Sequence, residues 1–204
     1  KTYVDKIIDK ISGEHFKNYN VNKIVRNDFG AKIYYGGENE FFDYDKVVIA
    51  THADQALDII DNPTSDEEEI LKNFKYRDNS AVIHFDESIM PKNRKAWCSW
   101  NSSMSKDNIK KTSVTYWLNQ LQNLKINRDI FLTINPFRDI PEDKIFKKVK
   151  FTHPYYDNAA LSNQNNLNKI QNKKNILFCG SYFGYGFHED GIKSSIDMLK
   201  TLND

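Results

Sequence analysis

The sequence predicts a mixed α/β fold of the α+β kind, and three stretches of its 204 residues carry that prediction. Residues 47–50 form an apolar run without alternation, which is typical of a strand buried on both faces of a parallel sheet. Residues 176–179 form a second such run, followed by a glycine-rich loop and a helical pattern. Residues 79–136 hold strand-like runs joined by polar loops, which indicates a separate antiparallel layer.

The chain begins with a helical pattern and continues as a β-meander. Apolar residues from Tyr3 to Ile11 follow the period of an amphipathic helix, and Gly13 is the residue expected just beyond its end. Hairpin-turn sequences (Asn-Asp-Phe-Gly and Gly-Gly) then separate β-prone runs. These runs cover residues 21–26, 31–35 and 40–42.

Two short helices are expected after the apolar run at 47–50. The first covers about residues 54–60. The second begins at Ser65, which forms a predicted capping box with Glu68. The middle layer should then contain strands at 81–85, 96–100, 113–118 and 130–134.

The last part of the chain alternates between helical and strand patterns. Residues 157–171 are rich in Asn but keep apolar residues near helical spacing, so we expect a helix there. After the strand and the glycine-rich loop, a final helix carries apolar residues on one face. They are Ile192, Ile196, Leu199 and Leu202.

Composition excludes several classes of protein. The 29 basic and 28 acidic residues give a net charge of +1, too low for a protein that binds nucleic acid through its overall charge. No apolar run approaches the roughly 20 residues needed to span a bilayer, so no transmembrane segment is expected. Cys98 and Cys179 cannot build a disulfide framework, and no signal-peptide pattern precedes the first helix. We therefore expect a cytoplasmic protein.

Glycines concentrate between the last strand and the last helix. Four of the chain's 8 glycines lie there: Gly180, Gly184, Gly186 and Gly191. Such a junction lets backbone N–H groups and a helix N-terminus approach a pyrophosphate or a polarised carbonyl. The spacing is neither G-x-G-x-x-G nor a Walker loop. The residues alone therefore leave a ligand site and a plain turn equally open.

Other reactive patterns are weak. His188, Glu189 and Asp190 are adjacent, so they share no face of a helix or strand, and no metal site is expected. No serine or cysteine has the setting of a catalytic nucleophile, and the catalytic residues stay unknown. Trp97, Trp100, Tyr116 and Trp117 gather in the middle strands, where each is either a core residue or part of an apolar cavity wall.

Several blocks together resemble a known family. They resemble, in the expected order, the predicted NAD/FAD-binding dehydrogenases of the flavin amine-oxidase superfamily, and more specifically their C-terminal half. The blocks cover residues 45–57, 84–101, 114–122, 133–136, 153–154 and 178–191. The resemblance implies the C-terminal part of a two-domain, Rossmann-like FAD-binding flavoprotein, with a β-meander and an antiparallel substrate-domain sheet.

The resemblance also implies domain limits and a cofactor site. Residues 1–62 and 151–204 would belong to the FAD-binding domain, and 63–150 to the substrate domain. FAD would be bound noncovalently. The matching positions are Val21 for adenine, Ala50 and Thr51 at the strand end, Gly180 and Ser181 near the pyrophosphate and ribityl chain, and Gly186, Phe187, His188, Glu189 and Asp190 near the flavin pyrimidine edge. Ser181 stands where the family usually has an acid. Trp100 and Tyr116 would line the substrate pocket.

The sequence departs from the family at its beginning. The G-x-G-x-x-G unit that should hold the ADP pyrophosphate is missing, and the chain opens without methionine. We therefore expect a fragment with an incomplete FAD site, inactive alone and able to self-associate through exposed sheet edges.

Two functions remain open at this point. The first is an FAD-dependent oxidoreductase acting on a small or lipid-derived apolar substrate. The alternative is a non-catalytic α+β binding module that has lost its cofactor. The sequence specifies neither the substrate nor the electron acceptor.

Overall fold

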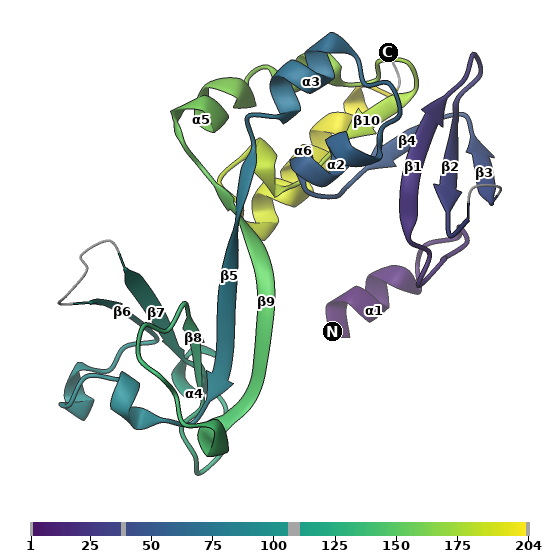
Figure 1. Cartoon of the computed structure of the whole chain (residues 1–204). Helices are drawn as coiled ribbons and strands as arrows, with labels where there is room; N and C mark the ends of the chain where they lie inside the picture. Colours follow the sequence, from purple (N-terminus) through teal and green to yellow (C-terminus); the bar gives the residue numbers. More distant parts are fainter. Residues whose placement is uncertain (1, 38–39, 106–110, 203–204) are drawn as a thin grey trace. The chain divides into compact units, whose positions relative to one another are not determined.

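A computed structural model describes residues 2–37, 40–105 and 111–202 (Figure 1). The chain divides into two compact units. Unit 1 contains the residues up to Lys75 and those from Tyr156 onward, and unit 2 is Tyr76–Tyr155. No helix in the described part is long and apolar enough to cross a membrane.

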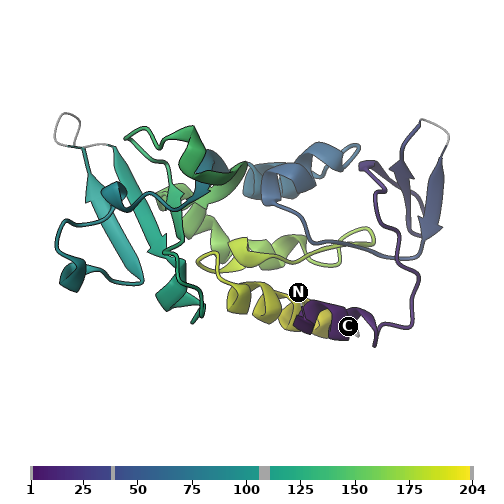
Figure 2. The same cartoon turned by 90° about the horizontal axis from the view of Figure 1, so that it is seen from below.

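Unit 1 contains a pair of parallel strands, each of which the sequence predicted, although it did not predict that they pair with each other. β4 (Val47–Ile49) and β10 (Ile176–Phe178) run parallel, with Ile176 opposite Val47. All three residues of β10 are fully buried. Figure 2 shows α2 (Ala53–Ile59) and α3 (Ser65–Leu71) on one side of this pair and α6 (His188–Lys200) on the other. Helices on both sides explain why both faces of β10 are apolar. The predicted burial of β4 on both faces was wrong, because Val48 in its centre is 44% exposed.

The N-terminal part of unit 1 is the predicted meander. β1 (Val21–Arg26), β2 (Ala31–Tyr35) and β3 (Phe41–Tyr44) form an antiparallel sheet in the order β1-β2-β3. Aromatic rings cover one face of it, and Phe42 stacks on Tyr35 with ring centroids 4.8 Å apart. Phe16 and Tyr19, from the segment before β1, join the same cluster.

Two predicted helix boundaries in unit 1 were wrong. α1 (Thr2–Ile8) ends well before Gly13, because Lys10 N and Ile11 N donate to carbonyls three residues back and close the last turn early. The capping box of α3 uses Thr64 and Glu67, one residue before the predicted pair. Glu67 is fully buried and pairs with Arg26 of β1, and this tertiary contact selects the register.

The segment before β10 is helical, as predicted. It consists of α5 (Asn158–Gln164) and the 3₁₀ turn η4 (Leu167–Ile170). The Asp157 side chain caps α5 by accepting from Ala160 N at 2.9 Å. After β10, the 3₁₀ turn η5 (Ser181–Phe183) leads into α6.

Unit 2 is built on a five-stranded sheet in the order β6-β7-β8-β5-β9. The strands are β5 (Lys75–His84), β6 (Trp100–Met104), β7 (Thr112–Trp117), β8 (Phe131–Ile134) and β9 (Ile145–Tyr155). The register pairs β5 with β8, β6 with β7, and β7 with β8, all antiparallel. β9 was not predicted. Short turns complete the unit: η1 (Glu87–Ile89), η2 (Arg94–Ala96), α4 (Leu118–Leu121) and η3 (Glu142–Lys144).

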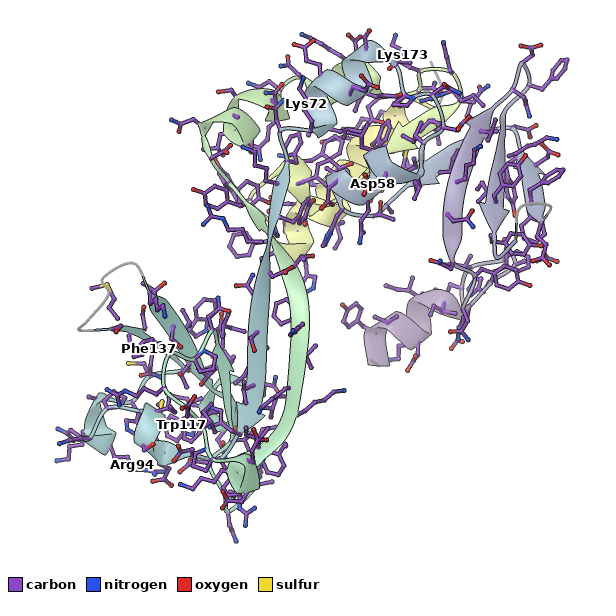
Figure 3. All side chains as sticks on the ribbon, in the orientation of Figure 1. Asp58, Lys72, Arg94, Trp117, Phe137 and Lys173 are labelled. Atoms are coloured by element: carbon purple, nitrogen blue, oxygen red, sulfur yellow. The ribbon has the colours of Figure 1, made fainter. Side chains whose placement is uncertain are left out.

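The predicted strand at 96–100 was also wrong. The segment before Trp100 is a turn, because the Asn93 side chain accepts from Lys95 N at 3.0 Å. The Trp97 indole donates to Pro91 O at 2.7 Å and fixes that turn. Trp97 then lies against the edge of Trp117, with ring centroids 5.3 Å apart. Arg94 lies over both rings, and Figure 3 shows it near Trp117.

Candidate functional site

The ends of the two parallel strands lie side by side in unit 1. Cys179 N donates to Ile49 O at 3.1 Å, which continues the pairing one residue past β10. A Cβ placed on Gly180 would lie 3.6 Å from Thr51 O. The residues that follow β4 and those that follow β10 are therefore close enough to touch. The carboxyl ends of parallel strands are where ligands bind in open α/β sheets.

The glycine-rich loop folds back on Ser181. Gly184 N and Gly186 N both donate to Ser181 O, at 3.1 and 3.2 Å. The Tyr156 hydroxyl donates to the same carbonyl at 3.4 Å. Gly186 has φ of 92°, a backbone conformation that residues with a side chain rarely adopt. The loop therefore depends on glycine at this position.

Asp190 fixes the entry into α6. Its Oδ2 accepts from Tyr185 N at 3.0 Å and from Phe187 N at 2.9 Å. Phe187 is the residue before the helix and has no side-chain oxygen to cap it. The first amides of a helix have no acceptor within the helix, and Phe187 supplies no side-chain acceptor for them. The amides of His188 and Glu189 thus carry the partial positive charge of the helix N-terminus.

Two residues that the sequence did not point to support this loop. Ser194 Oγ accepts from Gly180 N at 2.9 Å and donates to Gly191 O at 2.7 Å, so it ties β10 to α6. Burial, followed by the negative charge of Asp190, raises the pKa of Tyr156 to about 12, so its hydroxyl stays protonated. The sequence did offer a signal for Ser194: it lies three residues after Gly191 and, on a helix, on the face opposite Ile192 and Ile196.

The structure brings most of the predicted cofactor residues to one place. Ala50 and Thr51 follow β4, Gly180 and Ser181 follow β10, and the residues from Gly186 to Asp190 form the loop end and the first turn of α6. Tyr185 and Phe187 are 69% and 67% exposed, so the loop is open to solvent.

Val21 is the exception within unit 1. It begins β1 in the separate meander, opposite Tyr35. In the part of the chain that the structure describes, no hydrogen bond joins it to the glycine-rich loop. Its predicted contact with adenine therefore stays a prediction.

The predicted substrate-pocket residues are neighbours in unit 2. Trp100 lies opposite Tyr116 on adjacent strands, and their ring centroids are 4.9 Å apart in an edge-to-face arrangement. Trp100 is 62% exposed, so its indole lies on the surface of the sheet and not in the core. No group of three His, Cys, Asp or Glu side chains in residues 2–37, 40–105 and 111–202 could hold a metal ion.

Comparisons with known proteins identify the fold. No protein-family model and no curated relative matches the chain. Solved structures do match. A fatty acid isomerase from P. acnes that produces CLA has a TM-score of 0.67 at 12% identity, over 98% of this chain and 51% of its own. Putrescine oxidase bound to putrescine has a TM-score of 0.65 at 10% identity, over 100% of this chain and 52% of its own.

The similarity to these isomerase and oxidase structures is one of fold. Cyclohexylamine oxidase from Brevibacterium oxydans also matches, with a TM-score of 0.56 at 10% identity over 91% of this chain and 49% of its own. The chain spans about half the length of the solved structures that it matches. At these identities the similarity establishes the mixed α/β fold with its five-stranded antiparallel sheet.

Proposed function

We propose that this chain supplies the C-terminal part of an FAD-dependent oxidoreductase of the amine-oxidase type. Unit 1 would then be part of the cofactor domain and unit 2 part of the substrate domain. One observation carries the proposal. The ends of β4 and β10, the glycine-rich loop and the N-terminus of α6 meet at one place. They do so within a fold that matches about half of the length of each solved amine oxidase structure.

The residues present fit the cofactor. FAD, when bound, would accept a hydride from the substrate. The backbone of Gly180 and Ser181 lies at the strand ends where a phosphate chain can approach closely. The uncapped amides of His188 and Glu189 would stabilise negative charge on the flavin pyrimidine edge. Gly186, with φ of 92°, keeps side-chain bulk out of the loop at this point.

Unit 2 offers an apolar surface for a substrate. Trp100 and Tyr116 stand on one face of the sheet, and Leu132 lies opposite Tyr116 on the next strand. Aromatic and aliphatic side chains of this kind line binding sites for apolar ligands. This supports a small or lipid-derived apolar substrate.

Flavin binding tests the proposal. In the whole protein, FAD should be tightly but noncovalently bound, and denaturation should release free flavin. The 204-residue chain alone should bind FAD only at micromolar or weaker affinity by fluorescence quenching, because the half that would hold the pyrophosphate is not part of it. A whole protein that binds no FAD would favour a binding module without cofactor. Flavin that stays attached after denaturation would contradict noncovalent binding.

A further inference from the structure

Helix α5 reaches the glycine-rich loop through the side chain of Gln164. Its Nε2 donates to Gly184 O at 2.5 Å and to Tyr182 O at 3.4 Å. A side-chain amide nitrogen carries two hydrogens, so these two bonds use both of its donors. Both carbonyls lie between the end of β10 and the start of α6, where backbone groups find their partners outside an α-helix or sheet. Gln164 therefore supplies partners to the loop from a separate element.

The peptide group between Gly184 and Tyr185 is bonded on both of its sides. Its carbonyl oxygen accepts from Gln164 of α5, and its N–H donates to Asp190 Oδ2 of α6 at 3.0 Å. A peptide group has one donor and one acceptor on the main chain, so both of its polar groups are engaged here. Rotating the peptide would break both bonds at once. Gln164 and Asp190 together therefore fix its orientation.

The orientation of this peptide passes directly into the start of α6. The oxygen of Asp190 that holds Tyr185 N also accepts from Phe187 N at 2.9 Å. Gly186 lies between those two amides and has φ of 92°. The segment from the held peptide to the helix is thus short, and it is bonded at each end. Without Gln164 the peptide is free to rotate, and such a rotation breaks the bond through which Asp190 ties the loop to the helix.

Helix α5 does not need Gln164 for its own stability. The Asp157 side chain caps its N-terminus, Ala160 is 1% exposed, and Leu167 in the following turn is fully buried. Gln164 is the last residue of α5, and in the part of the chain that the structure describes both bonds of its amide nitrogen go to the loop. Losing this side chain should therefore disturb the loop and leave the helix in place.

We propose that Gln164 is a positioning residue for the flavin cofactor. Through the peptide between Gly184 and Tyr185, it holds the first amides of α6, those of His188 and Glu189, toward the flavin pyrimidine edge. This inference deepens the proposed function and rests on it. Gln164 acts through the loop and not by contact with cofactor or substrate. Amides that stabilise negative charge at that edge favour the reduced cofactor, so Gln164 should raise both the FAD affinity and the reduction potential.

Removing the amide of Gln164 tests this role in the whole protein. Gln164→Leu leaves the two carbonyls without their donor and should lower the FAD affinity about tenfold. It should also lower the reduction potential by about 30 mV, which is a tenfold change for a two-electron couple. The matched control is Asn163→Leu, because the side-chain bonds of Asn163 go to Ala159 and Asn166 within the same segment. The control should keep the affinity and the potential of the wild type. Losses for Gln164→Leu that are no larger than those of the control would overturn the proposal.

A carboxyl group at this position adds a test by pH. In Gln164→Glu the ionised carboxylate faces two carbonyl oxygens, so the losses should match those of Gln164→Leu. Once protonated, the carboxyl group can donate to Gly184 O again, and the affinity and potential should return toward the wild-type values at the same pH. Asp190, Lys193 and Asp197 line the same cavity. These groups are present in both variants, so the difference between the two reports on the new carboxyl group. Losses in Gln164→Glu that do not diminish as the pH falls would contradict the proposal.

Hydrogen exchange separates this proposal from the cofactor proposal. In the apoprotein the amides of Tyr185 and Phe187 are bonded to Asp190. In Gln164→Leu they should exchange about tenfold faster than in the wild type, whereas Asn163→Leu should leave their exchange unchanged. Unchanged exchange in Gln164→Leu would overturn the positioning role, even in a protein that binds FAD. A wild-type protein that binds no FAD would instead overturn the proposed function, and the exchange result would still show whether Gln164 orients the loop.

Discussion

Gly184 and Asp190 lie so close together that a Cβ on Gly184 would be 2.2 Å from Asp190 Oδ1. The other carboxylate oxygen holds Tyr185 N and Phe187 N. The absence of a side chain at Gly184 thus makes room for the carboxylate that shapes the loop before α6. Loop shape and helix start are coupled through this contact.

Gly184→Ala should therefore destabilise the protein. The added methyl group must displace Asp190, and overpacking of this kind costs about 1–3 kcal/mol in the free energy of unfolding. Urea denaturation measures the loss. The control is Gly37→Ala, because a Cβ there meets no atom of the described residues within 4 Å. Similar effects of the two substitutions would show that Asp190 moves aside without cost.

A pair of glycine substitutions separates a cofactor cradle from a simple turn. In the whole flavoprotein, Gly186→Ala should lower the stability of the apoprotein, because Gly186 has φ of 92°, and should reduce FAD affinity by more than this loss of stability explains. At Gly191 a Cβ would meet only Ser181 N, at 3.9 Å, so Gly191→Ala should have the smaller effect on affinity. Equal and modest losses of affinity and stability at Gly186 would favour a turn without a cofactor role.

The pair of Arg26 and Glu67 should be sensitive to removal of one partner. Both side chains are largely buried, and Glu67 Oε2 also accepts from Thr64 N at 2.8 Å. Glu67→Gln keeps the helix cap but leaves the Arg26 charge without its partner, which should cost about 3–5 kcal/mol in the free energy of unfolding. Adding Arg26→Met should recover part of that loss in a double-mutant cycle. No recovery would mean that the pair is uncoupled.

Stability of unit 2 should depend on pH through His84. Asp86 N donates to His84 Nδ1 at 3.1 Å, so the neutral ring donates from Nε2 to Thr133 Oγ1 at 2.7 Å. Burial lowers the pKa of His84 to about 4, against an unfolded value near 6.5. Between these values only the unfolded chain takes up the proton, so the free energy of unfolding should fall as pH decreases from about 6.5 to about 4.

Equilibrium unfolding at a series of pH values measures this dependence. Carboxylates titrate in the same range, so the comparison is with His84→Gln, which cannot be protonated there but can still donate to Thr133. The difference in stability between the two proteins should change with pH across this window. A constant difference would contradict the lowered pKa.

Local patterns in the sequence were enough to predict the elements that depend on turn residues, on a continuous apolar run or on glycine. Hairpin-turn residues delimit β1 and β2, and the apolar runs at β4 and β10 indicate strands, of which β10 is buried on both faces. The glycine spacing likewise located the loop before α6, because few residues other than glycine tolerate such backbone conformations.

Tertiary contacts decided the rest. The capping box of α3 moved by one residue because Glu67, not Glu68, is buried against Arg26. Residues before Trp100 form a turn because Asn93 and Trp97 bond to nearby backbone groups, which periodicity does not report. The apolar face of α6 is the clearest case. Its pattern shows only that Ile192, Ile196 and Leu199 share a face, whereas the fold shows that small residues such as Ser194 pack inward and leave that face exposed.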